Sequence, residues 1–127
     1  MNIEHDTPSL PARDPNGHKG TFGSVGVFGG RCAGGQRMVG APCLAALAAL
    51  RAGAGLARIA APEPIIDACL TIAPSATGTP LPVDAAGEIL PAEAARVLSE
   101  AIESSSAIVI GPGLGVSDAT GALALQA

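Results

Sequence analysis

The sequence contains no tryptophan or tyrosine and only two phenylalanines among its 127 residues. Charged residues are also scarce, at 14%, whereas 48% of the residues are hydrophobic. A core must therefore be built from alanine, leucine, isoleucine and valine, and such small side chains let helices and strands approach closely. The length of 127 residues fits one domain or part of one.

Basic residues are too few for a surface that binds nucleic acid. Seven lysines and arginines stand against 11 aspartates and glutamates, and the net charge of -4 has the wrong sign for binding a phosphate backbone. The N-terminus has neither the basic start nor the apolar core of a signal peptide. The longest near-apolar run, Met38 to Leu50, is too short to cross a bilayer. We expect neither nucleic acid nor a membrane as partner.

Cysteine occurs three times, at Cys32, Cys43 and Cys69. The odd number, the lack of a Cys-x-x-Cys pair and the lack of histidine at ligand spacing disfavour both a disulfide framework and a zinc site. We therefore expect buried, reduced thiols, no metal site and a cytoplasmic location.

Apolar runs separated by glycine and proline predict alternating strands and helices. Residues 1–17 are proline-rich and are expected to form an N-terminal arm, and residues 18–127 to form part of one domain. Strands are expected over residues 22–28, 56–61 and 107–110, and helices over 38–52, 62–70, 91–104 and from about 117 onward. Residues 71–90 are expected to form a long loop or a short edge strand. This order predicts an α/β fold with a parallel sheet.

Loops at residues 29–35, 60–64 and 111–115 directly follow the expected strands, and two of them are rich in glycine. In open α/β sheets, ligands bind beyond the carboxyl ends of the strands. No Walker A or Gly-x-Gly-x-x-Gly motif occurs, and glycines after a strand also form ordinary tight turns. The residues alone therefore leave both interpretations open. The helix expected near Ser117 would offer its N-terminus to an anionic group.

A set of segments in fixed order carries a resemblance to a known family. The segments are His18 to Gly23, an apolar strand ending in Gly29-Gly30, Val39 to Leu56, Ala61 to Glu63, and Ile110 to Gly115. Together they resemble the N-terminal half of the ADP-dependent NAD(P)H-hydrate dehydratases, which belong to the ribokinase-like superfamily. The resemblance runs from about residue 13 to 115, with residues 69–89 poorly matched. It implies a partial ribokinase-like fold, a mostly parallel sheet with flanking helices.

The resemblance also implies a lyase that uses ADP and Mg²⁺ to dehydrate the S epimer of hydrated NADH or NADPH. In that family, the segment heading the first long helix and the Gly-Pro-Gly loop contact the hydrated dinucleotide. The substrate-binding candidates that follow are Ala41, Gly113, Gly40 and Gly111, and after them Lys19, Gly29 and Gly30.

The family's aspartate base and its phosphate-binding glycine motif would lie beyond Ala127, so we assign no catalytic residue. We expect this chain to be truncated and inactive alone. Two alternatives remain: another ribokinase-like kinase acting on a small molecule, and a non-catalytic module that binds a dinucleotide. A parallel sheet cut short would expose an apolar edge, which favours association into a homo-oligomer.

Overall fold

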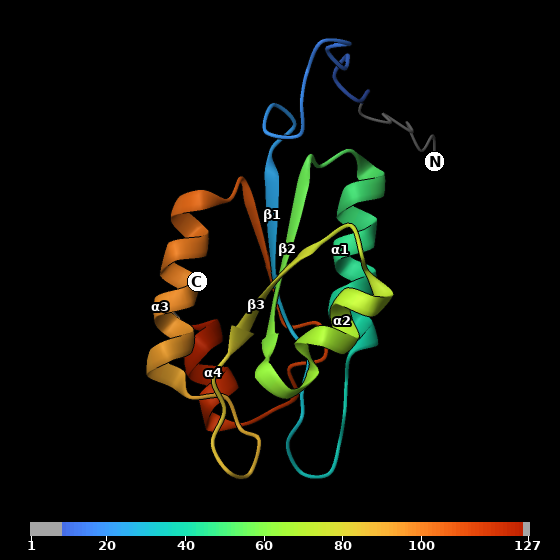
Figure 1. The fold of residues 1–127 in the computed structure, drawn as a ribbon. Coiled ribbons are helices and arrows are strands. Elements are labelled where there is room, and N and C mark those ends of the chain that lie inside the picture. The colour runs from blue at the N-terminus through green and yellow to red at the C-terminus, as the bar shows by residue number, and fades with distance from the viewer. Residues whose placement is uncertain (1–8, 126–127) are drawn as a thin grey trace, which may run out of the picture.

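The computed structural model describes residues 9–125 and shows a four-stranded sheet with helices on both faces (Figure 1). The strand order is β3-β2-β1-β4, and every neighbouring pair is parallel. The strands are β1 (Ser24–Phe28), β2 (Leu56–Pro62), β3 (Thr77–Leu81) and β4 (Ala107–Ile110). The helices are α1 (Gly40–Ala52), the 3-10 turn η1 (Glu63–Ile65), α2 (Ile66–Ile72), α3 (Pro91–Ser104) and α4 (Asp118–Ala124). The predicted α/β class is confirmed.

Most predicted elements occur at the expected places. The ranges of α3 and β4 agree with the prediction, and residues 71–90 contain the edge strand β3. β1 begins two residues later than expected, because Gly23 adopts a left-handed conformation with φ of 76°. α1 begins at Gly40 instead of residue 38, because Met38 pairs with Arg31 in an isolated antiparallel bridge.

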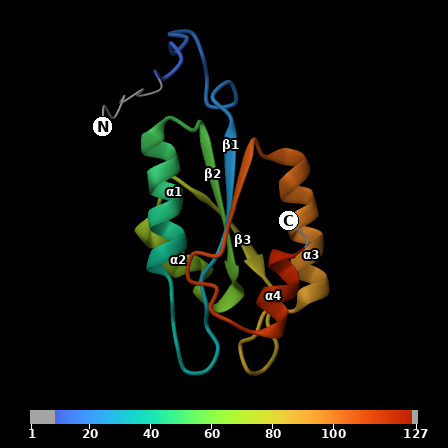
Figure 2. The ribbon, with the colours of Figure 1, turned by 180° about the vertical axis from the view of Figure 1, so that it is seen from behind.

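The two faces of the sheet bury different side chains, since successive residues of a strand point to opposite faces. Val27 and Ile59 are fully buried in the core that lies under α1 and α2. Phe28 and Ala60, each one residue further on, belong to the core under α3 and α4. Figures 1 and 2 show these two pairs of helices on opposite sides of the sheet.

The described part of the predicted arm, residues 9–17, forms turns and no helix or strand, and residues 1–8 lie outside the described residues. Arg13 lies over the ring of Phe22, 3.9 Å from its centroid. Its Nη1 also donates a hydrogen bond to the carbonyl of Gly53, at 3.2 Å. These contacts hold this segment against the C-terminal end of α1, at the end of the sheet where the strands begin. Within residues 9–125, no helix combines the length and apolarity needed to cross a membrane.

Candidate functional site

The loops that follow β1 and β4 are hydrogen-bonded to each other at the edge where the parallel strands end (Figure 1). The N–H of Gly30 donates to the carbonyl of Pro112, at 2.9 Å, and that of Gly111 donates to Phe28, at 3.1 Å. The N–H of Gly29 donates to the carbonyl of Ala60 on β2, at 3.0 Å. The ends of three strands are thus joined through glycine backbone.

This close approach depends on glycine at residues 29 and 30. A Cβ on Gly29 would lie 2.2 Å from the carbonyl oxygen of Pro112, a distance at which the two loops must separate. Gly30 has a φ of 86°, and a Cβ there would lie 2.9 Å from Cδ1 of Ile65. Both glycines therefore let backbone segments pack where any side chain would hold them apart.

The structure brings together the two main candidates, Ala41 and Gly113. Gly113 has a φ of 71°, and a Cβ built on it would lie 3.4 Å from Cβ of Ala41 and 3.7 Å from Cα of Gly30. No heavy atom lies within 4 Å of a Cβ built on Gly40 or Gly111, and both residues are exposed. We call this cluster of Gly29, Gly30, Gly40, Ala41, Gly111 and Gly113 the glycine edge; the backbone of Gly40 and Gly111 faces solvent, whereas Gly29 and Gly30 are buried.

Lys19 does not belong to the glycine edge. Its carbonyl packs against Gly55, just before β2 begins, so it lies at the opposite end of the parallel strands. It lines an open cavity of about 520 Å³ together with Arg13 and Asp14 of the described arm and with the neighbouring His18. The structure therefore separates Lys19 from the other candidates.

Arg31 and Glu88 lie beside the glycine edge, and the sequence analysis did not select them. Nη2 of Arg31 lies 2.7 Å from Oε1 of Glu88, and the side chains are only 15% and 31% exposed. The position of Arg31, directly after Gly29-Gly30, was a signal that could have identified it. Glu88 lies in the irregular stretch before α3, where nothing in the sequence marks it.

The three cysteines are free and buried, as expected. Burial raises the pKa of the Cys32 thiol, and it raises the pKa of Cys69 to about 12, with a further contribution from the neighbouring Cys43. Thiols with raised pKa values stay protonated at neutral pH and are poor nucleophiles. Cys32 and Cys69 therefore have a packing role.

The described residues do not supply a site for a metal ion or for nucleotide phosphates. Among residues 9–125, no group of three histidine, cysteine, aspartate or glutamate side chains is placed to hold a metal. The N-terminus of α4 is closed by a capping box: Oγ of Ser117 accepts from the N–H of Thr120, at 3.3 Å, and Oγ1 of Thr120 accepts from the N–H of Ser117, at 2.9 Å. Two of the N–H groups at this helix terminus are thus already paired within the protein.

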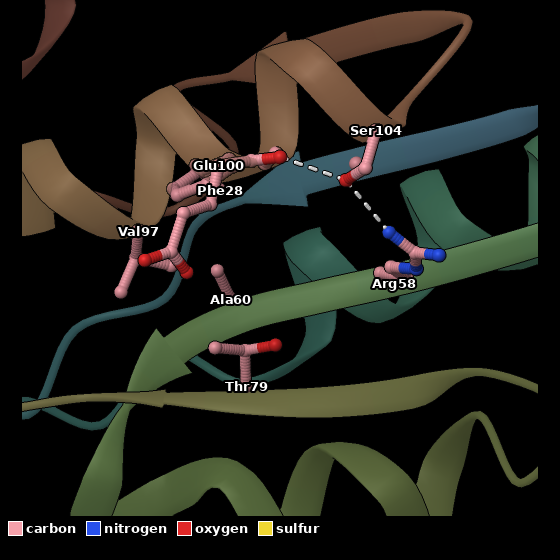
Figure 3. Close-up of a pocket in the computed structure, with 9 residues that line it drawn as sticks. Phe28, Arg58, Ala60, Thr79, Val97, Glu100 and Ser104 are labelled. Atoms are coloured by element: carbon pink, nitrogen blue, oxygen red, sulfur yellow. Dashed lines mark hydrogen bonds between the residues drawn. The ribbon is translucent and has the colours of Figure 1, made fainter.

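A separate cavity of about 140 Å³ lies between α3 and the strands β1, β2 and β3 (Figure 3). Nη1 of Arg58 donates to Oγ of Ser104 across this cavity, at 2.9 Å, and that hydroxyl donates to the carbonyl of Glu100, at 2.8 Å. No residue of the glycine edge lines it.

Comparison with known proteins decides the family. The sequence model described as NAD(P)H-hydrate dehydratase matches residues 31–127. The chain belongs to the NAD(P)H-hydrate dehydratase family. It is 41% identical over 108 residues to the bifunctional NAD(P)H-hydrate repair enzyme Nnr of Salinibacter ruber, a match that covers 83% of this chain and 19% of the relative.

Two further relatives come from Bacillus subtilis. The ADP-dependent (S)-NAD(P)H-hydrate dehydratase is 36% identical over 115 residues, which cover 87% of this chain and 35% of the relative. The solved structure of the ADP/ATP-dependent NAD(P)H-hydrate dehydratase, co-crystallised with ATP/Mg²⁺, has 32% identity and a TM-score of 0.65, over 92% of this chain and 37% of that one. These matches confirm a partial ribokinase-like fold, and the chain spans 19 to 37% of the length of the three relatives.

Proposed function

We propose that this chain is the N-terminal part of an ADP-dependent dehydratase that restores hydrated NADH or NADPH, and that it supplies the substrate side of the site. The relatives that match most of this chain are named for NAD(P)H-hydrate repair or dehydration, which supports this class of substrate. We assign the activity to the longer protein, because no aspartate or glutamate of this chain follows a Gly-Thr-Gly-like motif of the kind that the family resemblance implies.

One observation carries the proposal: the convergence of Ala41 and Gly113 beside the open backbone of Gly40 and Gly111. A polar ligand such as the hydrated nicotinamide ring can approach backbone donors and acceptors closely where no side chain projects. The position at the carboxyl ends of parallel strands is where ligands bind in open α/β sheets.

The role of this chain toward the substrate is to bind and orient it. The described residues do not fit the metal or the nucleotide phosphates, since they provide no ligand cluster and the N-terminus of α4 is capped. The same proposal includes the use of ADP and Mg²⁺ by the longer protein. It also includes a cytoplasmic location, which suits free thiols.

The test is calorimetric titration of the purified chain with the S epimer of hydrated NADH. We expect saturable binding, and a loss of about tenfold in affinity (~1.4 kcal/mol) when Ala41→Leu fills the space beside Gly113. Ala48→Leu is the matched control, because Ala48 is an exposed residue further along the same helix. Its affinity should equal that of the unmodified chain.

A second measurement follows the recovery of NADH absorbance after ADP is added. We expect no turnover by the 127-residue chain. Robust turnover would show that the chain contains a catalytic base that we have not identified. Failure to bind the hydrate at all would refute the assignment of the substrate side, and binding of a small alcohol instead would favour a ribokinase-like kinase.

A further inference from the structure

Arg31 connects three segments around the glycine edge, two through its side chain and one through its backbone. Its Nη2 pairs with Glu88 in the loop before α3, at 2.7 Å. Its Nη1 donates a long hydrogen bond, 3.5 Å, to the carbonyl of Leu114 in the loop after β4. Its own backbone pairs with Met38, just before α1, through hydrogen bonds of 3.2 and 2.9 Å.

Arg31 packs closely against the loop after β4, and this contact depends on the absence of a side chain at Gly115. A Cβ built on Gly115 would lie 2.8 Å from Cδ and 2.9 Å from Nη1 of Arg31. The guanidinium therefore lies directly against the backbone of Gly115, which itself has a φ of 75°. Gly113, the substrate candidate, is only two residues away along the same loop.

Glu88 is a fixed anchor for Arg31. The Asp84 carboxylate accepts hydrogen bonds from the N–H groups of Ala86 and Glu88, at 2.8 and 2.9 Å, which closes a tight turn. Gly87, with a φ of 84°, packs against the backbone of Cys32, and the Cys32 thiol donates to the Gly87 carbonyl, at 3.3 Å. The loop that carries Glu88 is thus held to the residue that follows Arg31.

Burial strengthens this ion pair relative to the other ion pair of residues 9–125. The Arg31 side chain is 15% exposed, whereas the side chains of Arg96 and Glu100 on α3 are 67% and 64% exposed. Exposed pairs contribute little, because water and salt screen them. A charge-assisted bond that is largely shielded from water is stronger and more directional.

The pocket beside Arg31 offers no space for a ligand. It is bounded by Gly30, Arg31, Glu88 and Leu114, and it is too narrow to admit even a water molecule. We propose that Arg31 is a positioning residue. It fixes the loop 111–115 against the turn after β1, and so sets the distance between Gly113 and Ala41 on which binding of the dinucleotide depends. The effect of Arg31 on dinucleotide binding rests on the proposed function. Its effect on the position of the loop 111–115 does not.

The first measurement is amide hydrogen exchange of the chain without ligand, in which Arg31→Ala is compared with three variants. We expect Arg31→Ala to speed exchange in residues 111–115 by about tenfold, because local opening becomes easier. Arg31→Lys should rescue part of the protection, since it keeps the charge opposite Glu88 but loses the fork that reaches Leu114. Arg96→Ala, which breaks the exposed pair, should leave this loop unchanged.

Leu98→Ala separates positioning from a general loss of stability. Leu98 is buried in the core under α3, so its truncation lowers the unfolding temperature without touching Arg31. In Leu98→Ala, the rate of amide hydrogen exchange should rise across the whole chain, and not selectively in residues 111–115. If Arg31→Ala gives the same uniform pattern as Leu98→Ala, the positioning role is overturned.

The second measurement is the affinity of the same variants for the S epimer of hydrated NADH. We expect Arg31→Ala to weaken binding about tenfold and Arg31→Lys by less. If the unmodified chain binds no hydrate while its loop still loosens in Arg31→Ala, the proposed function fails and the positioning of the loop stands. If Arg31→Ala loosens the loop but binds as tightly as the unmodified chain, the effect on substrate is overturned.

Discussion

Replacement of Gly29 by alanine tests the most tightly packed contact of the glycine edge. The new Cβ would lie 2.2 Å from the carbonyl oxygen of Pro112 and 3.0 Å from Cβ of Pro42. The nearest atom is backbone, so a side-chain rotation cannot relieve the clash. Either the loop after β4 or the end of β1 has to move.

Two terms set the size of the effect. Overpacking a filled site costs about 1–3 kcal/mol. Moving Pro112 also breaks the hydrogen bond that its carbonyl accepts from Gly30, 2.9 Å long, at a further cost of about 1 kcal/mol. We therefore expect Gly29→Ala to lower the free energy of unfolding by about 2–4 kcal/mol, and the melting temperature by roughly 8–16 °C for a chain of this size.

The assay is thermal unfolding followed by circular dichroism, with Gly121→Ala as control. A Cβ on Gly121 meets no heavy atom within 4 Å, and Gly121 lies inside α4. Alanine in a helix interior is favoured over glycine by about 0.5–1 kcal/mol, so this variant should melt slightly higher than the unmodified chain. The two Gly→Ala changes thus have opposite predicted signs. If Gly29→Ala melts at or above the temperature of the unmodified chain, the close approach of the two loops is refuted.

Two further predictions concern the two cores. Leu98→Ala should lower the free energy of unfolding by about 2–5 kcal/mol in urea titrations, because it leaves a cavity in the core under α3; an unchanged midpoint would contradict the packing of α3. The pKa of Cys69 is raised from 9.0 to about 12 in the folded chain, so its contribution to stability is complete below pH 9.0 and is lost as pH rises toward 12. Cys69→Ala should flatten that alkaline decline.

Local patterns predicted the fold well where one periodicity dominated. α3 has apolar residues at helical spacing over one face, and Ala94, Val97 and Leu98 are indeed its buried residues. The start of α1 was predicted less accurately, because the bridge between Met38 and Arg31 joins residues across a loop. For residues 71–90 the sequence predicts either a long loop or a short edge strand, because Gly78 and Pro80 have weak strand propensity. Pairing with β2 decides the conformation of β3.

The candidate site could be predicted only in part. The glycines that follow β1 and β4 were predictable, since ligands approach the carboxyl ends of parallel strands and both loops are glycine-rich. The separation of Lys19 from them was predictable too, because Lys19 precedes β1 and the glycines follow β1 and β4; Lys19 was a candidate on the resemblance alone. The pairing of Arg31 with Glu88 joins residues 57 positions apart and depends on the folded turn at Asp84, which no local pattern encodes.

The position of the glycine edge within the sheet bears on how catalytic groups reach it. β4 is an edge strand among the described residues, and its Val109 is 37% exposed, whereas the opposite edge strand β3 contains Pro80, a residue that sheets tolerate at edges. A strand that paired in parallel with β4 would end beside Gly111, and the loop after it would face the open side of Gly111. If the proposed function holds, the glycine edge is closed by Arg31 on the side of β1 and open on the side of β4, where a base and phosphate-binding groups of the longer protein would reach the bound hydrate.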